Sequence, residues 1–280
     1  VFGLVLFIWR ELTYKRPVVN LGVLKDGNLR IGTVMCFILG FGLYGSTLII
    51  PIYTQTILGW TATDAGLLLI PGSITTAFMM PIVGKLLQRG VPQSYMVGLG
   101  FLIFFFFTYM MHNNMTPSTG VEHLYWGLIL RGIGLGLLFV PITTLSLSTL
   151  KGKDIGEGAA FTGMMRQLGG SFGIATITTF ITRFNQEHRV NLVSHLDTTR
   201  LEVQQRVLTL QKGFMSKGFT ANESLNKAYQ VIDYSVMKQS AVLSYMDIFL
   251  YLGIMFLCCI PIIFLIKKGK NTINPADAMH

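Results

Sequence analysis

The chain has 280 residues, of which 51% are hydrophobic and only 12% are charged, and its formal net charge is +9. Soluble domains of this length carry about a quarter charged residues, so the composition favours a membrane protein over a soluble globular domain. The basic residues lie mainly between apolar runs. A nucleic-acid-binding protein instead gathers them on one face of a soluble fold, so nucleic acid is not an expected partner.

Apolar runs of membrane-spanning length recur along the chain and predict an all-α membrane protein. Residues 1–9 are apolar but shorter than the roughly 20 residues that a span needs, so we interpret them as the end of a helix that begins upstream. A polar, basic connector over 10–30 follows. Six complete transmembrane helices are then expected: five within 31–183, at about 31–52, 65–86, 92–111, 123–149 and 157–183, with Asp64 as a cap of the second, and a last one within 241–266, at about 243–266.

The basic residues are divided unequally between the two sides of the predicted bundle. The two short loops on one side, 53–63 and 112–122, contain no lysine or arginine. The short connections on the other side contain twelve: Arg10, Lys15, Arg16, Lys25, Arg30, Lys85, Arg89, Lys151, Lys153, Lys267, Lys268 and Lys270. The positive-inside rule therefore predicts that this second side, with the C-terminal tail 267–280, faces the cytoplasm.

The long polar stretch 184–240 is expected on the opposite, extracytoplasmic side. Its residues 201–211 have the spacing of an amphipathic helix. Thr220 and Glu223 match a capping box, which predicts a second helix that can run directly into the last span. Two interpretations remain open: a solvated helical hairpin, or a docking surface for a periplasmic partner.

Two arginines lie deep inside predicted spans. Arg131 comes eight residues after His123, about 12 Å along a helix from one side, and Arg166 is similarly deep from the other side. A charge at mid-membrane costs roughly 2.5–3.5 kcal/mol on insertion scales, so both side chains are expected to face the bundle interior or a water-filled cavity. Each arginine either bonds backbone carbonyls for structural reasons, or it lines the transport route and gates or tunes a proton site.

A polar and aromatic stripe on the first span is typical of a cavity wall. Tyr44, Thr47, Pro51 and Gln55 recur at helical spacing and share one face. Further candidates for an apolar substrate surface, each of which also suits ordinary packing, are Tyr53, Phe139, Phe161, Met165 and Phe172. The pairs Gly132 with Gly136 and Gly169 with Gly173 have the small-xxx-small spacing that brings membrane helices close together.

No acidic residue lies clearly in the middle of a predicted span, and Asp64, Glu157 and Asp247 lie at span edges. Proton coupling in membranes normally uses embedded carboxylates or histidines, so the main proton carrier is expected outside this chain. Asp247 is the best local candidate, with an interfacial cap or anchor as the alternative. The sequence contains no nucleophile motif, metal-ligand set or phosphate loop, so we expect neither an enzyme nor a cofactor or metal.

Several motifs together resemble the fourteen-span drug:proton antiporters of the EmrB/QacA type in the major facilitator superfamily. The motifs are Pro51-x-Tyr53-x-Gln55 with Gly59-Trp60-Thr61-Ala62, Gly84-Lys-Leu86-Leu-Gln-Arg89-Gly90, Arg131-Gly-x-Gly through Pro141, Arg166-Gln-Leu-Gly-Gly-x-x-Gly173, and Tyr245-x-Asp247-x-Phe249. The second resembles the family's cytoplasmic loop motif through Gly84, Arg89 and Gly90, but Gln88 replaces its acidic residue.

The resemblance implies the C-terminal half of a bundle of two pseudo-symmetric halves that alternates access around a central cavity. It also implies export of drugs or other apolar or cationic small molecules in exchange for protons. The expected partners are the lipid bilayer, the missing N-terminal half, substrate and protons, and in some relatives a periplasmic adaptor. A narrow-specificity metabolite or siderophore exporter and a non-transporting membrane scaffold remain alternative functions.

Overall fold

The computed structural model describes residues 26–150, 152–197 and 200–263, and every regular element in these ranges is an α-helix. The predictions for 1–9, for 267–280 and for residues 10–25 of the connector lie outside the described residues. The helices are α2 (Gly27–Thr56), α3 (Ala62–Leu68), α4 (Ile70–Gln88), α5 (Gln93–Asn114), α6 (Val121–Leu147), α7 (Lys153–Ser194), α8 (Leu201–Met215) and α9 (Ala221–Ile263).

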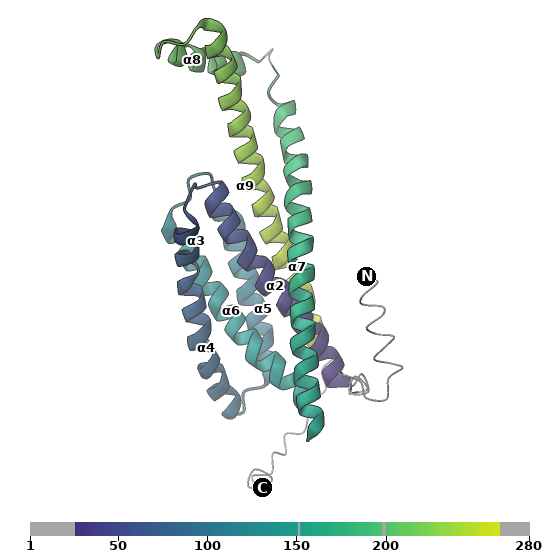
Figure 1. The fold of residues 1–280 in the computed structure, drawn as a ribbon. Helices are drawn as coiled ribbons and strands as arrows, with labels where there is room; N and C mark the ends of the chain where they lie inside the picture. The colour runs from purple at the N-terminus through teal and green to yellow at the C-terminus, as the bar shows by residue number, and fades with distance from the viewer. Residues whose placement is uncertain (1–25, 151, 198–199, 264–280) are drawn as a thin grey trace.

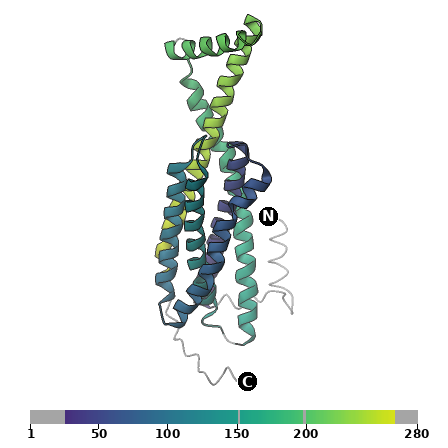
Figure 2. The same ribbon diagram turned by 90° about the vertical axis from the view of Figure 1, so that its left-hand side faces the viewer.

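The long helices pack side by side in one bundle (Figures 1 and 2). Helix α6 packs against α5, α4 and α2, while α7 packs against α2 and α9, and α9 also packs against α5. Helices α4 and α7 therefore lie at the two sides of a surface whose middle is formed by α2 and α6. Helices α5 and α9 lie behind them.

Five segments are long and apolar enough to cross a membrane: Gly27–Thr56, Ala62–Gln88, Gln93–Asn114, Val121–Leu147 and Ala221–Pro261. They correspond to five of the six predicted spans. The predicted span 157–183 lies inside α7, which is not among the five. Arg166, Gln167 and several glycines lower the mean hydropathy of this helix, although it packs in the same bundle.

The second predicted span is built from two helices. Thr61, not Asp64, is the N-cap of α3: its hydroxyl accepts a hydrogen bond from the backbone N–H of Asp64 and donates to the Asp64 carboxylate at 2.7 Å. Helix α3 ends at Leu68, and α4 begins with Pro71 in its first turn. Proline has no N–H to donate, so it fits the first turn of a helix better than its interior.

Two helices extend far beyond the bundle. Helices α7 and α9 contain 42 and 43 residues, about 63 Å each, whereas a membrane core is about 30 Å thick. Helix α7 continues past residue 183, the predicted end of the fifth span, because residues 184–194 contain no proline or glycine that would interrupt it. Helix α8 lies across the tip of this projection (Figure 1). We call α8 and the projecting parts of α7 and α9 the hairpin.

The predicted capping box at the start of α9 is present. Thr220 donates its backbone N–H and its hydroxyl to Glu223 Oε2, at 3.0 and 2.8 Å, and Glu223 N–H donates back to the Thr220 hydroxyl. As predicted, the helix that begins here runs without a break into the last span.

Phenylalanines fill the interface between α5 and α9. Phe104 stacks on Phe256 with ring centroids 4.2 Å apart, and Phe107 meets Phe249 edge-on at 5.7 Å. The other side of α5 exposes large apolar side chains: Tyr95, Leu99, Leu102, Phe106 and Tyr109. Helix α5 is therefore apolar all round, as expected for a helix that borders lipid.

Glycines bring α2 and α7 into backbone contact. A Cβ atom added to Gly169 would come within 2.0 Å of the Phe37 carbonyl oxygen, and one on Gly40 would come equally close to the Arg166 carbonyl oxygen. Gly132 and Gly136 serve the contact between α6 and α4 in the same way, against Gly72 and Met79. Both predicted small-xxx-small pairs therefore lie at close helix contacts.

Candidate functional site

The predicted stripe on α2 lies at an open edge of the bundle. Tyr44, Thr47 and Pro51 are partly exposed and Gln55 is exposed, whereas Gly45, Ser46, Ile49 and Ile50 on the other face are buried. The helical spacing read from the sequence thus separates a buried face of α2 from a face that neighbouring described helices leave open. We call the open face, with the adjoining parts of α6 and α7, the α2 face.

Arg131 joins α6 to α2 from inside the bundle. Its guanidinium donates from Nε to Ser46 Oγ at 2.9 Å and from Nη2 to the Leu43 carbonyl oxygen at 3.2 Å, and Nη2 also contacts the Thr47 hydroxyl. Only 5% of the residue is exposed. The arginine is therefore held by two hydroxyls and one backbone carbonyl, whereas the structural alternative considered from the sequence expected backbone carbonyls.

Arg166 joins α7 to α6 in a different way. Its Cζ atom lies 4.5 Å from the centre of the Phe139 ring, a cation–π distance, and both residues are partly exposed. Beside it, the Tyr44 hydroxyl donates to Gln167 Oε1 at 2.9 Å and so connects α2 to α7. The two arginines have separate partners and do not pair with each other.

The remaining candidates for a substrate surface differ in burial. Met165 is partly exposed, and Phe172 is 55% exposed with its ring 5.8 Å from that of Phe37. Phe161 is buried. Tyr53 is fully buried, and its hydroxyl donates to the Thr116 carbonyl oxygen at 2.6 Å, so it lies away from the α2 face.

Neither deep arginine has a carboxylate partner in the part of the chain that the structure describes. Among the described residues, the ion pairs are His188 with Asp247, at 2.6 Å, and Arg189 with Asp233, at 2.9 Å. Both join α7 to α9 in the part of the molecule that leads to the hairpin. Asp247 therefore has a histidine partner on a neighbouring helix, and it lies on α9, away from the α2 face.

The loop motif lies between α4 and α5. Arg89 is exposed, and Gly90 has a φ of 85°, a left-handed conformation that favours glycine. The Gly90 N–H donates to the Leu87 carbonyl oxygen at 3.0 Å and closes the end of α4. Gly84 is partly exposed one turn earlier. The left-handed conformation of Gly90 therefore ends α4 and turns the chain toward α5.

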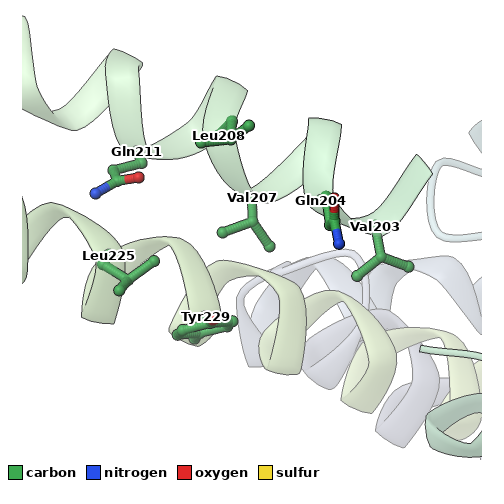
Figure 3. A pocket seen from close by; sticks show the side chains of 7 residues that line it. All are labelled: Val203, Gln204, Val207, Leu208, Gln211, Leu225 and Tyr229. Atoms are coloured by element: carbon green, nitrogen blue, oxygen red, sulfur yellow. The ribbon is translucent and has the colours of Figure 1, made fainter. Parts of the chain in front are cut away.

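A separate cavity of ≈ 330 Å³ lies in the hairpin between α8 and α9 (Figure 3). Its lining is mainly apolar with two amides: Val203, Gln204, Val207, Leu208, Gln211, Leu225 and Tyr229. Figure 3 shows that these side chains come only from α8 and α9. The cavity is thus remote in sequence and in space from the α2 face.

A model of the Major Facilitator Superfamily matches residues 2–174, which is more than half of the chain. The chain belongs to the Major Facilitator Superfamily. Proteins of this superfamily are transporters rather than enzymes, and the chain is a multi-pass membrane protein.

Several relatives of this chain are named for resistance to, or export of, small molecules. The chain is 28% identical over 262 residues to the fatty acid resistance protein FarB of Neisseria gonorrhoeae, which covers 93% of this chain and 50% of that protein. It is 28% identical over 193 residues to the multidrug export protein EmrB of Escherichia coli K12, covering 69% of this chain and 37% of EmrB. It is 33% identical over 175 residues to the lincomycin resistance protein LmrB of Bacillus subtilis 168, covering 62% and 36%. The EmrB/QacA resemblance is thereby confirmed, and the chain spans half or less of each relative.

Three residues that contact the predicted candidates were not themselves predicted from the sequence. Ser46 holds Arg131, Gln167 accepts from Tyr44, and His188 pairs with Asp247. Each contact joins two helices that are far apart in the chain. Only the position of Gln167 next to Arg166, in a span that is otherwise apolar, was a signal in the sequence.

Proposed function

We propose that this chain is the C-terminal half of a secondary transporter that exports apolar small molecules from a bacterial cytoplasm by proton antiport. The observation that carries the proposal is the α2 face, where Tyr44, Thr47 and Arg166 are partly exposed and Tyr44 donates to Gln167, the neighbour of Arg166. Polar groups at membrane depth mark a route for substrate or ions. Membership of the superfamily and the names of the relatives, which refer to resistance and export, support the same function.

The proposal treats α7 as a sixth span and the α2 face as the surface that meets the N-terminal half of the transporter. Helices α2, α4, α6 and α7 border that surface, and transporters of this kind bind substrate between two halves. The short loops that contain lysine and arginine then face the cytoplasm, with the C-terminus. The hairpin projects on the other side, where a periplasmic adaptor is the proposed partner.

The two deep arginines act as gating or tuning groups in this proposal. Proton transfer itself needs an embedded acid, and the described acids near the spans lie elsewhere: Asp64 and Asp154 are in the first turns of α3 and α7, Glu157 is in the second turn of α7, and Asp247 lies beside His188. The proton carrier is therefore assigned to the N-terminal half. Asp247 with His188 is assigned to tuning at the outer end of α7 and α9.

The test uses the full-length transporter that contains this chain, expressed in bacteria that lack their own drug pumps. Cells are loaded with Nile red, a neutral apolar dye, and with a panel of other apolar compounds. The proposal predicts lower accumulation in expressing cells, and loss of the difference when a protonophore collapses the proton gradient. Unchanged accumulation across the whole panel would contradict it.

A further inference from the structure

Helix α8 has two apolar stripes, although only one of them faces the rest of the described chain. Val203, Val207 and Leu210 recur at helical spacing on the side where α8 packs against α9. Val207 is buried there, and the other two are partly buried. A helix at a protein surface needs one apolar stripe to pack on its own fold. A second stripe therefore calls for an occupant from outside this fold.

The second stripe consists of Leu201, Leu208 and Met215, which follow one another at a spacing of seven residues. Their exposed fractions are 67%, 52% and 46%. A spacing of seven keeps side chains on nearly the same face of a helix, and it is the repeat through which two helices pack together. We call these three residues the outer stripe. It borders the cavity of Figure 3, so the apolar surface continues from Leu208 onto Leu225 and Tyr229 of α9.

The lipid bilayer that holds the bundle does not reach the outer stripe. Helix α8 lies across the tip of the hairpin, at the end away from the bundle, in both views (Figures 1 and 2). Helices α7 and α9 are longer than the membrane core by about 30 Å, so this tip stands in the aqueous space. Because α8 lies across helices that cross the membrane, it runs along the membrane plane.

The symmetry of membrane proteins matches the direction of α8. Two copies in one membrane have the same orientation, so a two-fold axis that relates them is parallel to the membrane normal. Such an axis keeps α8 at the same height and reverses its direction, and two α8 helices then meet antiparallel. The outer stripe suits this arrangement, because Leu208 in its middle meets its own equivalent and Leu201 meets the second copy's Met215.

The charges of α8 favour the same arrangement. Glu202 lies in the first turn of the helix and Lys212 lies in the last turn. Antiparallel pairing places the acidic end of each α8 beside the basic end of the other, and it opposes the two helix dipoles. A parallel pair would place like charges together. The helix is therefore complementary to a reversed copy of itself.

The outer stripe is small for a dimer interface. Helix α8 has 15 residues, about 22 Å, and Gln204 and Gln211 lie between the apolar residues on the same side. A contact of this size is weak between proteins that are free in solution. The membrane, however, confines two copies to one plane and one orientation, which raises their effective concentration. We therefore expect a reversible contact that forms in the membrane.

We infer that the outer stripe is a self-association surface, through which α8 of one copy pairs antiparallel with α8 of a second copy in the same membrane. This inference goes beyond the proposed function and does not depend on transport. A helix of a different protein, such as an adaptor, is the competing occupant of the stripe. The experiment separates the two occupants.

The test is disulfide crosslinking of the full-length transporter in bacterial membranes. Two copies without native cysteines are expressed together with different epitope tags, so a crosslink that joins the two tags identifies a pair of copies. Leu208→Cys places a thiol at the expected centre of the pair. Thr209→Cys is the matched control, because residue 209 is also exposed but points about 100° away around the helix. A disulfide needs Cα atoms within about 7 Å, so we expect crosslinking about tenfold faster at position 208 than at position 209.

A second pair of variants tests the direction of the helices. Leu201→Cys in one tagged copy should crosslink to Met215→Cys in the other. Two copies that both carry Leu201→Cys should not crosslink, because antiparallel pairing separates these positions by about 21 Å along the helix. Monodisperse elution of each purified variant shows that it is folded.

Three results would overturn the inference. Equal rates at positions 208 and 209 would show random collision, and efficient crosslinking between two Leu201→Cys copies would show a different arrangement. A Leu208→Cys variant that forms no crosslink between the tags, or that crosslinks only to another protein, would assign the stripe to a different occupant. Protonophore-sensitive export of Nile red can persist in each of these cases, so the inference and the proposed function fail separately.

Discussion

Arg131 donates a hydrogen bond from Nε to Ser46 Oγ at 2.9 Å, and so fixes α6 to α2 across the middle of the bundle. The Ser46 hydroxyl also donates to the Gly42 carbonyl oxygen at 2.6 Å, and the Thr47 hydroxyl donates to the Leu43 carbonyl oxygen at 2.6 Å. Both hydroxyls therefore keep a partner when Arg131 is removed. Replacement of Arg131 can therefore separate a role of this residue in folding from a role in transport.

Arg131→Met is expected to fold and to lose most of its export activity. Replacing a buried charge with an apolar side chain of similar volume is often neutral or stabilising, and here it leaves no hydroxyl unsatisfied. The thermal midpoint of the purified protein should therefore change by only a few degrees. Protonophore-sensitive export of Nile red should fall by at least about tenfold, because a charge tuning the route is worth a few kcal/mol. A variant that transports normally would assign Arg131 to packing alone.

Gly169→Ala tests the close contact of α7 with α2. The added Cβ would come within 2.0 Å of the Phe37 carbonyl oxygen, which is backbone and cannot move aside alone, so we expect a loss of about 1–3 kcal/mol in stability. Gly163→Ala is the matched control on the same helix, since nothing lies within 4 Å of its added Cβ. The control should be neutral or stabilising by up to about 1 kcal/mol through helix propensity. Thermal unfolding in detergent compares the two, and equal midpoints would argue against the described helix contact.

The features that sequence reasoning found are those that depend on neighbours along the chain. The open stripe of Tyr44, Thr47, Pro51 and Gln55 follows from helical periodicity, and the Thr220–Glu223 box follows from a spacing of three. The glycine pairs predicted close packing but not which helix they meet.

Contacts between helices could not be predicted in the same way. Arg131 and Ser46 are 85 residues apart, and His188 and Asp247 are 59 apart. Whether such pairs meet depends on the rotation and the axial position of each helix, which packing of the entire bundle determines. The length of α7 has another cause: hydropathy falls after residue 183, where the predicted span ends, but a helix continues wherever its backbone hydrogen bonds are not interrupted.

The pair of His188 and Asp247 is expected to couple α7 and α9 weakly. The two side chains are 23% and 40% exposed, so water screens their attraction and the interaction energy is about 0.2–1 kcal/mol. A double-mutant cycle with His188→Gln and Asp247→Asn, followed by chemical unfolding, measures it. A coupling energy of several kcal/mol would show that this pair is a main support of the hairpin.

The cap of α9 predicts a dependence on pH in the hairpin. Hydrogen bonds from the Thr220 hydroxyl and backbone N–H lower the pKa of Glu223 below its ordinary value. The stabilisation is therefore fully present above the ordinary carboxyl pKa and is lost as the pH falls through the lowered pKa. The protection of the first amides of α9, measured as their exchange rate relative to the intrinsic rate at each pH, should fall over that acidic range in wild-type protein. Glu223→Ala should show low protection at all pH values, and an acid-sensitive loss of protection that survives in this variant would exclude the cap as its cause.

The central claim is that the α2 face lines a water-filled substrate cavity, and cysteine labelling tests it most directly. In a full-length transporter without its native cysteines, including Cys36, Cys258 and Cys259, single cysteines replace Tyr44 on the α2 face and Phe106 on the exposed side of α5. A thiol reacts with a water-soluble maleimide only where water reaches it. We predict rapid labelling at position 44, slowed by an exported substrate, and little labelling at position 106. Equal labelling at the two positions, or labelling at 44 that no substrate slows, would contradict the claim.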